Sequence, residues 1–175
     1  MNMHTKSSEP DAKAAAHQPR LNYAEQSQQA VKKLTELVLL AHSSSIEEPI
    51  LDLVALRASQ MNGCAFCIDM HVKQAKLHGE RELRLYHVSA WRESPLFAPR
   101  ERAALAWTEI MTRLPEGGVA DEIYEKVRTQ LSEKEISDLT FFIAAINSWN
   151  RLGIGFKTVP GSLDATYGLT KAGLN

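Results

Sequence analysis

The sequence predicts an all-α protein, a compact bundle of about seven helices. Apolar residues recur at three- and four-residue spacing in successive segments, and serine, proline and glycine mark candidate helix ends between them. No segment shows a convincing alternation of apolar and polar residues, which is the pattern of a half-buried strand. An apolar fraction of 44% and a charged fraction of 23% are ordinary for a packed core, and 175 residues suit one domain.

The first two helices are expected at Tyr23 to about Ala41 and at about Ile46 to Met61. In the first, apolar positions follow helical spacing. The second is preceded by Ser45 and Glu48 at the spacing of a capping box, which predicts its start. Asn62-Gly63 predicts its end, because glycine accepts the left-handed conformation that helix ends favour.

Five further helices follow the same reasoning. They are expected from the cysteines to His78, over 80–91, 100–114 and 120–130, and from a Ser132/Glu135 capping box to Leu152. The stretch from Leu139 to Ile146 is apolar on nearly every side. A helix of that kind is buried in a core or between subunits, so we expect a homo-oligomer.

The helical domain is expected to cover residues 20–156. Residues 1–19 are polar and contain two prolines, which predicts a flexible N-terminal tail. Residues 157–175 are expected to form an irregular C-terminal tail, because glycines and Pro160 interrupt any helical pattern there.

Charge and hydropathy exclude two classes of partner. Lys plus Arg number 20 against 21 Asp plus Glu, whereas a nucleic-acid binder usually carries a basic excess. Wholly apolar runs such as Leu37 to Ala41 are far too short to cross a membrane. The first twenty residues lack the apolar region of a signal peptide, so we expect a cytoplasmic protein.

The two cysteines lie together as Cys64-Ala65-Phe66-Cys67, with His71 four residues later. If a helix begins at the cysteines, Cys67 and His71 share one helical face. Both thiols then lie in the first turn, where free N–H groups favour the thiolate. This arrangement indicates a redox site in which one thiol attacks and the other resolves the product to a disulfide.

This interpretation has two alternatives, and either thiol could attack first. A structural zinc site usually needs four protein ligands, and the chain offers only two cysteines and histidines. An inert pair of thiols is the other possibility. The helix dipole favours Cys64 as the attacking thiol, whereas the neighbouring histidine favours Cys67.

The stretch LVALRASQMNGCAFCIDMH at residues 53–71 resembles the AhpD-like alkylhydroperoxidases of the carboxymuconolactone decarboxylase superfamily. The resemblance extends to PRERAALAW at residues 99–107 and INSWNR at 146–151. It implies an all-helical, AhpD-like fold and subunits that assemble as trimers, dimers or hexamers.

The resemblance also implies roles for individual residues. Cys67 would attack the peroxide, Cys64 would resolve the intermediate and His71 would relay protons. Asp52 stands where the family has a glutamate, and Phe66 stands where it has a histidine between the cysteines. The implied substrate is a hydroperoxide, the implied reductant is a lipoyl-type or thioredoxin-like dithiol, and no cofactor or metal is needed.

Other interpretations remain for the activity and for several residues. The chain could be a decarboxylase-like lyase or a non-enzymatic thiol redox sensor. If the helices on either side of Asn62-Gly63 pack as an antiparallel pair, Asp52 is expected to face His71 and to orient its imidazole. Alternatively, Asp52 could be an exposed acid near a helix start. Arg57 and Gln60 are expected near the site. His78 is expected to have a structural role at the C-terminus of its helix, where a cation interacts favourably with the helix dipole.

Overall fold

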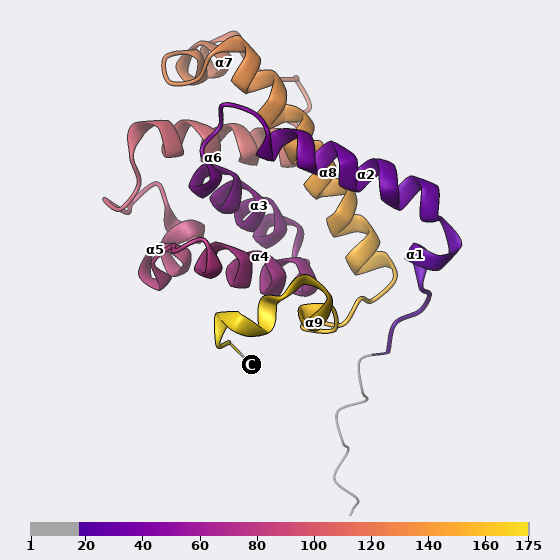
Figure 1. Ribbon diagram of the computed structural model, residues 1–175. Coiled ribbons are helices and arrows are strands. Elements are labelled where there is room, and N and C mark those ends of the chain that lie inside the picture. The colour runs from indigo at the N-terminus through magenta and orange to yellow at the C-terminus, as the bar shows by residue number, and fades with distance from the viewer. Residues whose placement is uncertain (1–17, 175) are drawn as a thin grey trace, which may run out of the picture.

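The structure, a computed structural model, describes residues 18–174, and within them it contains only helices (Figure 1). The predicted all-α class is confirmed. The elements are α1 (Tyr23–Gln26), α2 (Gln28–His42), α3 (Glu48–Asn62), α4 (Ala65–Leu77), α5 (Glu82–His87), η1 (Val88–Ala90), α6 (Pro99–Thr112), α7 (Asp121–Arg128), α8 (Glu133–Gly155), α9 (Asp164–Tyr167) and η2 (Leu169–Ala172).

Helix α3 lies at the centre of the bundle, packed against α4, α6 and α8 (Figure 1). Its residues from Ile50 to Leu56 are all buried. Residues 139–146 of α8, expected to be buried in a core or between subunits, are only partly buried within this chain, because Phe141 is 60% exposed. Leu139 and Ile143 on the opposite side of α8 are fully buried. The homo-oligomer stays a prediction.

The junction between α3 and α4 forms as the sequence predicts. Gly63 ends α3 in the left-handed conformation, with a φ of 72°. Cys64 follows as the N-cap of α4, and its Sγ accepts a hydrogen bond from the backbone N–H of Cys67 at 3.3 Å. The two helices therefore form a hairpin that carries both cysteines at its turn.

Two expected helices differ in the structure. The first helix is broken at Ser27 into α1 and α2, and α3 begins at Glu48 rather than at residue 46. Ser45 does not cap α3, because its hydroxyl donates to Glu135 Oε1 of α8 at 3.1 Å. The capping box of α8 is confirmed: Glu135 N–H donates to Ser132 Oγ, and Ser132 N–H donates to Glu135 Oε2.

The C-terminal segment is more ordered than the expected irregular tail. Helix α8 continues to Gly155, and α9 and η2 follow it. Helix η2 packs against α4, and the buried Lys73 of α4 donates to Asp69 at 2.9 Å and to Asp164 at 2.6 Å. The contact between Lys73 and Asp164 joins residues far apart in the chain, so no local sequence pattern predicts it. Residues 1–17 of the expected N-terminal tail, and residue 175, lie outside the described residues.

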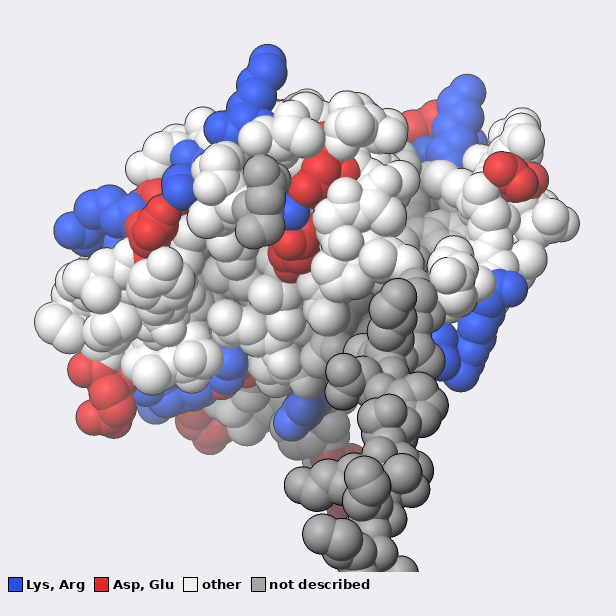
Figure 2. All heavy atoms as spheres, turned by 90° about the horizontal axis from the view of Figure 1, so that it is seen from below, with Lys and Arg blue, Asp and Glu red and all other residues white. Residues whose placement is uncertain are grey.

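The surface carries mixed charge. On the face seen from below in Figure 2, lysine and arginine lie scattered among aspartate and glutamate rather than gathered in one basic area. Several of these groups are paired, as Arg100 is with Glu47 and Arg128 with Glu133. Within residues 18–174, no helix is long and apolar enough to span a membrane.

Candidate functional site

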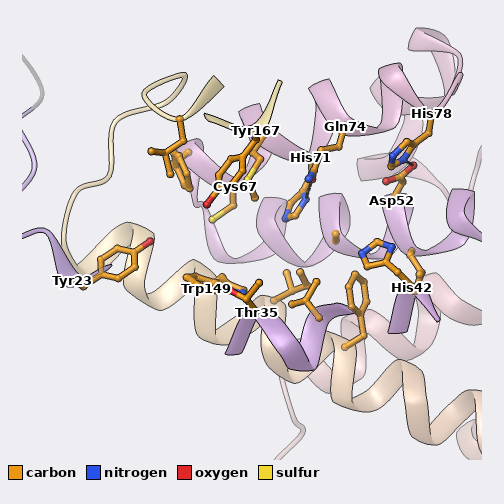
Figure 3. Close-up of a pocket in the computed structure, with 18 residues that line it drawn as sticks. Tyr23, Thr35, His42, Asp52, Cys67, His71, Gln74, His78, Trp149 and Tyr167 are labelled. Atoms are coloured by element: carbon orange, nitrogen blue, oxygen red, sulfur yellow. Dashed lines mark hydrogen bonds and ion pairs between the residues drawn. The ribbon is translucent and has the colours of Figure 1, made fainter. Parts of the chain in front are cut away.

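A cavity of about 190 Å³ lies between α2, α3, α4 and α8, and the segment after α8 closes part of it (Figure 3). Its wall is mostly apolar and aromatic, with a few polar groups. The lining residues are Tyr23, Thr35, Val38, His42, Leu51, Asp52, Ala55, Phe66, Cys67, Met70, His71, Gln74, His78, Phe142, Ile146, Trp149, Leu163 and Tyr167.

The two cysteines differ in their relation to this cavity. They are joined by a disulfide, with Cα atoms 5.3 Å apart, and both are buried. Cys67 belongs to the cavity wall, whereas Cys64 does not. Cys64 packs against α8 instead, where a Cβ added to Gly153 would stand 2.9 Å from its sulfur. A small molecule in the cavity therefore meets Cys67 first.

His71 lies one helical turn beyond Cys67 and is 7% exposed. Its Nδ1–H donates to Oε1 of Gln74 at 3.0 Å, while the other ring nitrogen points into the cavity (Figure 3). Burial lowers the pKa of His71 to about 4, although the hydrogen bond to Gln74 opposes the shift. At neutral pH the imidazole is uncharged, and its free nitrogen can accept a proton.

We expect this histidine to make the protein less stable in mild acid. Its folded pKa of about 4 lies below the ordinary value of 6.5, so the unfolded chain binds more protons between these two pH values. The stabilising contribution is complete above pH 6.5 and is lost as the pH falls towards 4. Between pH 7 and pH 5 the loss is about 2 kcal/mol of unfolding free energy.

The measurement is urea unfolding at pH 7 and at pH 5, for the wild type and for His71→Gln. The wild type should lose about 2 kcal/mol more than the variant over this interval. Equal losses in the two proteins would show that His71 does not titrate in this way. His87→Gln is the matched control for the loss of a histidine, because His87 contacts Ser94 outside the cavity.

Asp52 lies in the cavity wall but has a different partner from the one expected. Its Oδ2 accepts a hydrogen bond at 2.8 Å from Nδ1 of His78, and Gln74 is the partner of His71. Burial raises the pKa of Asp52, against the lowering effect of His78. Asp52 is therefore neither the exposed acid considered from the sequence nor a support for His71. His78 was expected only at a helix end, but its side chain also lines the cavity.

Other expected neighbours of the site lie elsewhere. Arg57 donates through Nε to Glu109 of α6 at 2.7 Å, and neither Arg57 nor Gln60 lines the cavity. The wall includes residues that sequence reasoning missed. Gln74 could have been found from its position three residues after His71 on the same helix. Tyr23 and Tyr167 carried no signal, because only the folded chain brings them to the cavity.

Comparison with known proteins gives consistent results. The family model described as carboxymuconolactone decarboxylase family matches residues 25–109, which include both cysteines. The uncharacterized protein YdfG of Bacillus subtilis is 42% identical over 135 residues, covering 77% of this chain and 92% of its own length.

Solved structures share the fold. A protein of unknown function from Agrobacterium tumefaciens, described as an AhpD candidate in antioxidant defence, superposes with a TM-score of 0.78 at 41% identity, covering 82% of this chain and 98% of that chain. The debrominase Bmp8 superposes with a TM-score of 0.70 over 85% of this chain and 79% of its own. At 16% identity, the likeness to Bmp8 concerns the fold alone.

Proposed function

Because the chain belongs to the carboxymuconolactone decarboxylase family and is AhpD-like, we propose that it is a thiol peroxidase acting on small organic hydroperoxides. One observation carries this proposal. Cys67, disulfide-bonded to Cys64, stands in the wall of an apolar cavity one helical turn from a neutral histidine. A nucleophile, a resolving thiol and a proton acceptor thus occur together.

In the first step the free nitrogen of His71 accepts the proton of the Cys67 thiol. The thiolate attacks the hydroperoxide oxygen that carries hydrogen, and the O–O bond breaks. Cys67 becomes a sulfenic acid, and the leaving alkoxide takes the proton from His71 and departs as an alcohol. Gln74 holds the imidazole through Nδ1, so the other nitrogen remains available for both transfers.

In the second step the thiol of Cys64 attacks the sulfenic sulfur of Cys67, which forms the disulfide and releases water. The N–H of Cys67 already points at Cys64 Sγ, and this helix end stabilises negative charge there. A dithiol donor then restores both thiols and is itself oxidised to a disulfide. Over one cycle, hydroperoxide and dithiol become alcohol, water and disulfide.

The burial of Cys64 and Cys67 restricts which reductants can reach the disulfide. Cys64 is 1% exposed and Cys67 is fully buried, so a cysteine on the surface of a folded thioredoxin cannot touch either sulfur. A slender, lipoyl-type dithiol can enter the cavity. The wall selects the substrate as well, because Phe66 and Phe142 present apolar rings that favour an organic hydroperoxide.

The test treats reduced full-length protein with one equivalent of cumene hydroperoxide and measures intact mass and free thiols. We expect the loss of two hydrogens, about 2 Da, and of both thiols. Turnover should follow with dihydrolipoamide and be much slower with thioredoxin and its reductase. Retention of both thiols under excess peroxide would contradict the proposal.

The same experiment separates the alternatives. A redox sensor forms the disulfide but does not turn over with any dithiol. A lyase does not need the thiols, so its turnover of a lactone substrate would be unchanged in a Cys64→Ser, Cys67→Ser double variant.

A further inference from the structure

We propose that Glu48, Asp52 and His78 form a binding site for one divalent transition-metal ion. Figure 3 shows Asp52 and His78 together at one end of the cavity, with His71 between them and Cys67. This site is separate from the thiol pair, and the inference does not depend on the proposed peroxidase activity.

The geometry of the three side chains suits an ion. One ligand atom from each, two carboxylate oxygens and one imidazole nitrogen, lie within 4.8 Å of one another. His78 Nδ1 is 2.8 Å from Asp52 Oδ2 and 3.5 Å from Glu48 Oε1. Zinc binds such atoms at about 2.0–2.2 Å, which sets tetrahedral ligand atoms about 3.4 Å apart. Small side-chain rotations, together with a shift of the His78 ring proton from Nδ1 to Nε2, are therefore enough to accept the ion.

The charge of the site also favours a cation. Within residues 18–174, neither Glu48 nor Asp52 is ion-paired with a lysine or an arginine. Their recorded partners are histidines. Two ionised carboxylates carry a charge of about −2, which a divalent ion balances. Asp52 is buried, so its carboxylate is poorly solvated by water.

His42 completes the arrangement as a positioning residue. Its Nδ1 donates to Glu48 Oε2 at 2.9 Å, which leaves Oε1 of the same carboxylate free to face His78. Hydrogen bonds of this kind orient metal-binding carboxylates. His78 and Glu48 are partly exposed, so an ion can enter from solvent. Three protein ligands leave a coordination position open, as in many catalytic zinc sites.

The mixture of imidazole and carboxylate favours a transition metal over calcium or magnesium, which prefer oxygen ligands throughout. The ordinary alternative is a pair of hydrogen-bonded histidine–carboxylate contacts with no affinity for metal. Binding measurements distinguish the two.

The experiment titrates ZnCl₂ into chelator-treated full-length protein at pH 7.5 by calorimetry. The protein is kept in the disulfide form, so its sulfurs cannot bind zinc. We expect one equivalent to bind with a Kd below about 10 μM, and bound zinc should raise the melting temperature. Glu48→Gln and His78→Gln should each weaken binding by at least about tenfold, and His42→Gln should weaken it less.

His87→Gln is the matched control, because His87 contacts Ser94 away from the cluster and should leave zinc affinity unchanged. Asp52→Asn is isosteric and is checked for folding by circular dichroism. Glu48 and His78 are partly exposed, so their variants test the site even if Asp52→Asn does not fold. Absence of zinc binding by the wild type, or wild-type affinity in both the Glu48 and the His78 variants, would overturn the proposal.

Discussion

Cys67→Ser is expected to reduce the rate of peroxide consumption by about a thousandfold or more, because it removes the nucleophile itself. Cys64→Ser should leave the first attack intact and stop the cycle at a sulfenic acid or an intermolecular disulfide. The physical reason is the position of the two sulfurs. Cys67 lines the cavity, whereas Cys64 is enclosed between the start of α4 and helix α8.

Single-turnover kinetics with cumene hydroperoxide measure this difference, and a sulfenic-acid trap identifies the intermediate in Cys64→Ser. The two serine variants serve as controls for each other, because each removes one sulfur from the same disulfide. The reverse result, a fast Cys67→Ser protein and an inactive Cys64→Ser protein, would make Cys64 the attacking thiol. Stabilisation of the Cys64 thiolate by the N-terminus of α4 would then matter more for reactivity than the access of peroxide to Cys67 from the cavity.

Structural features that depend only on residues close together in the sequence could be predicted. Gly63 ends α3 because the left-handed conformation of a glycine is a local requirement, and α4 begins at the cysteines as expected, with Cys64 as its N-cap rather than within its first turn. The capping box of α8 is equally local. Cys67 and His71 share a face of α4 because helical periodicity alone determines it. The core of the candidate site was therefore predictable.

The rest of the site depends on how the helices pack. Spacing along α3 placed Asp52 at a height where it could have faced His71, but lateral packing pairs it with His78. Tyr167 reaches the cavity because Lys73 ties the segment after α8 to α4 through Asp164. Glycines at 153 and 155 suggested the end of the last helix, yet α8 continues through both. Position 153 requires a glycine because α8 passes close to the disulfide there, and a side chain would meet the sulfur of Cys64.

Gly153→Ala is expected to destabilise the disulfide form and to impair turnover. The added Cβ would stand 2.9 Å from Cys64 Sγ and 3.5 Å from Cys67 Sγ, closer to the first sulfur than real contacts allow. Cys64 cannot move away easily, since its sulfur is bonded to Cys67 and accepts a hydrogen bond at the start of α4. Overpacking of this kind costs about 1–3 kcal/mol, the equivalent of about a tenfold to hundredfold effect.

The matched control is Gly155→Ala, two residues later on the same helix, where an added Cβ meets no atom within 4 Å. Because Gly155 is the last residue of α8, where helix propensity counts for less than in the interior, this variant should keep wild-type stability or gain slightly. Urea unfolding of both oxidised variants, with the peroxide turnover of each, measures the contrast. If Gly153→Ala matched Gly155→Ala in stability and turnover, α8 would not press on the cysteines, and Cys64 would be free to leave its enclosed position and meet the peroxide itself.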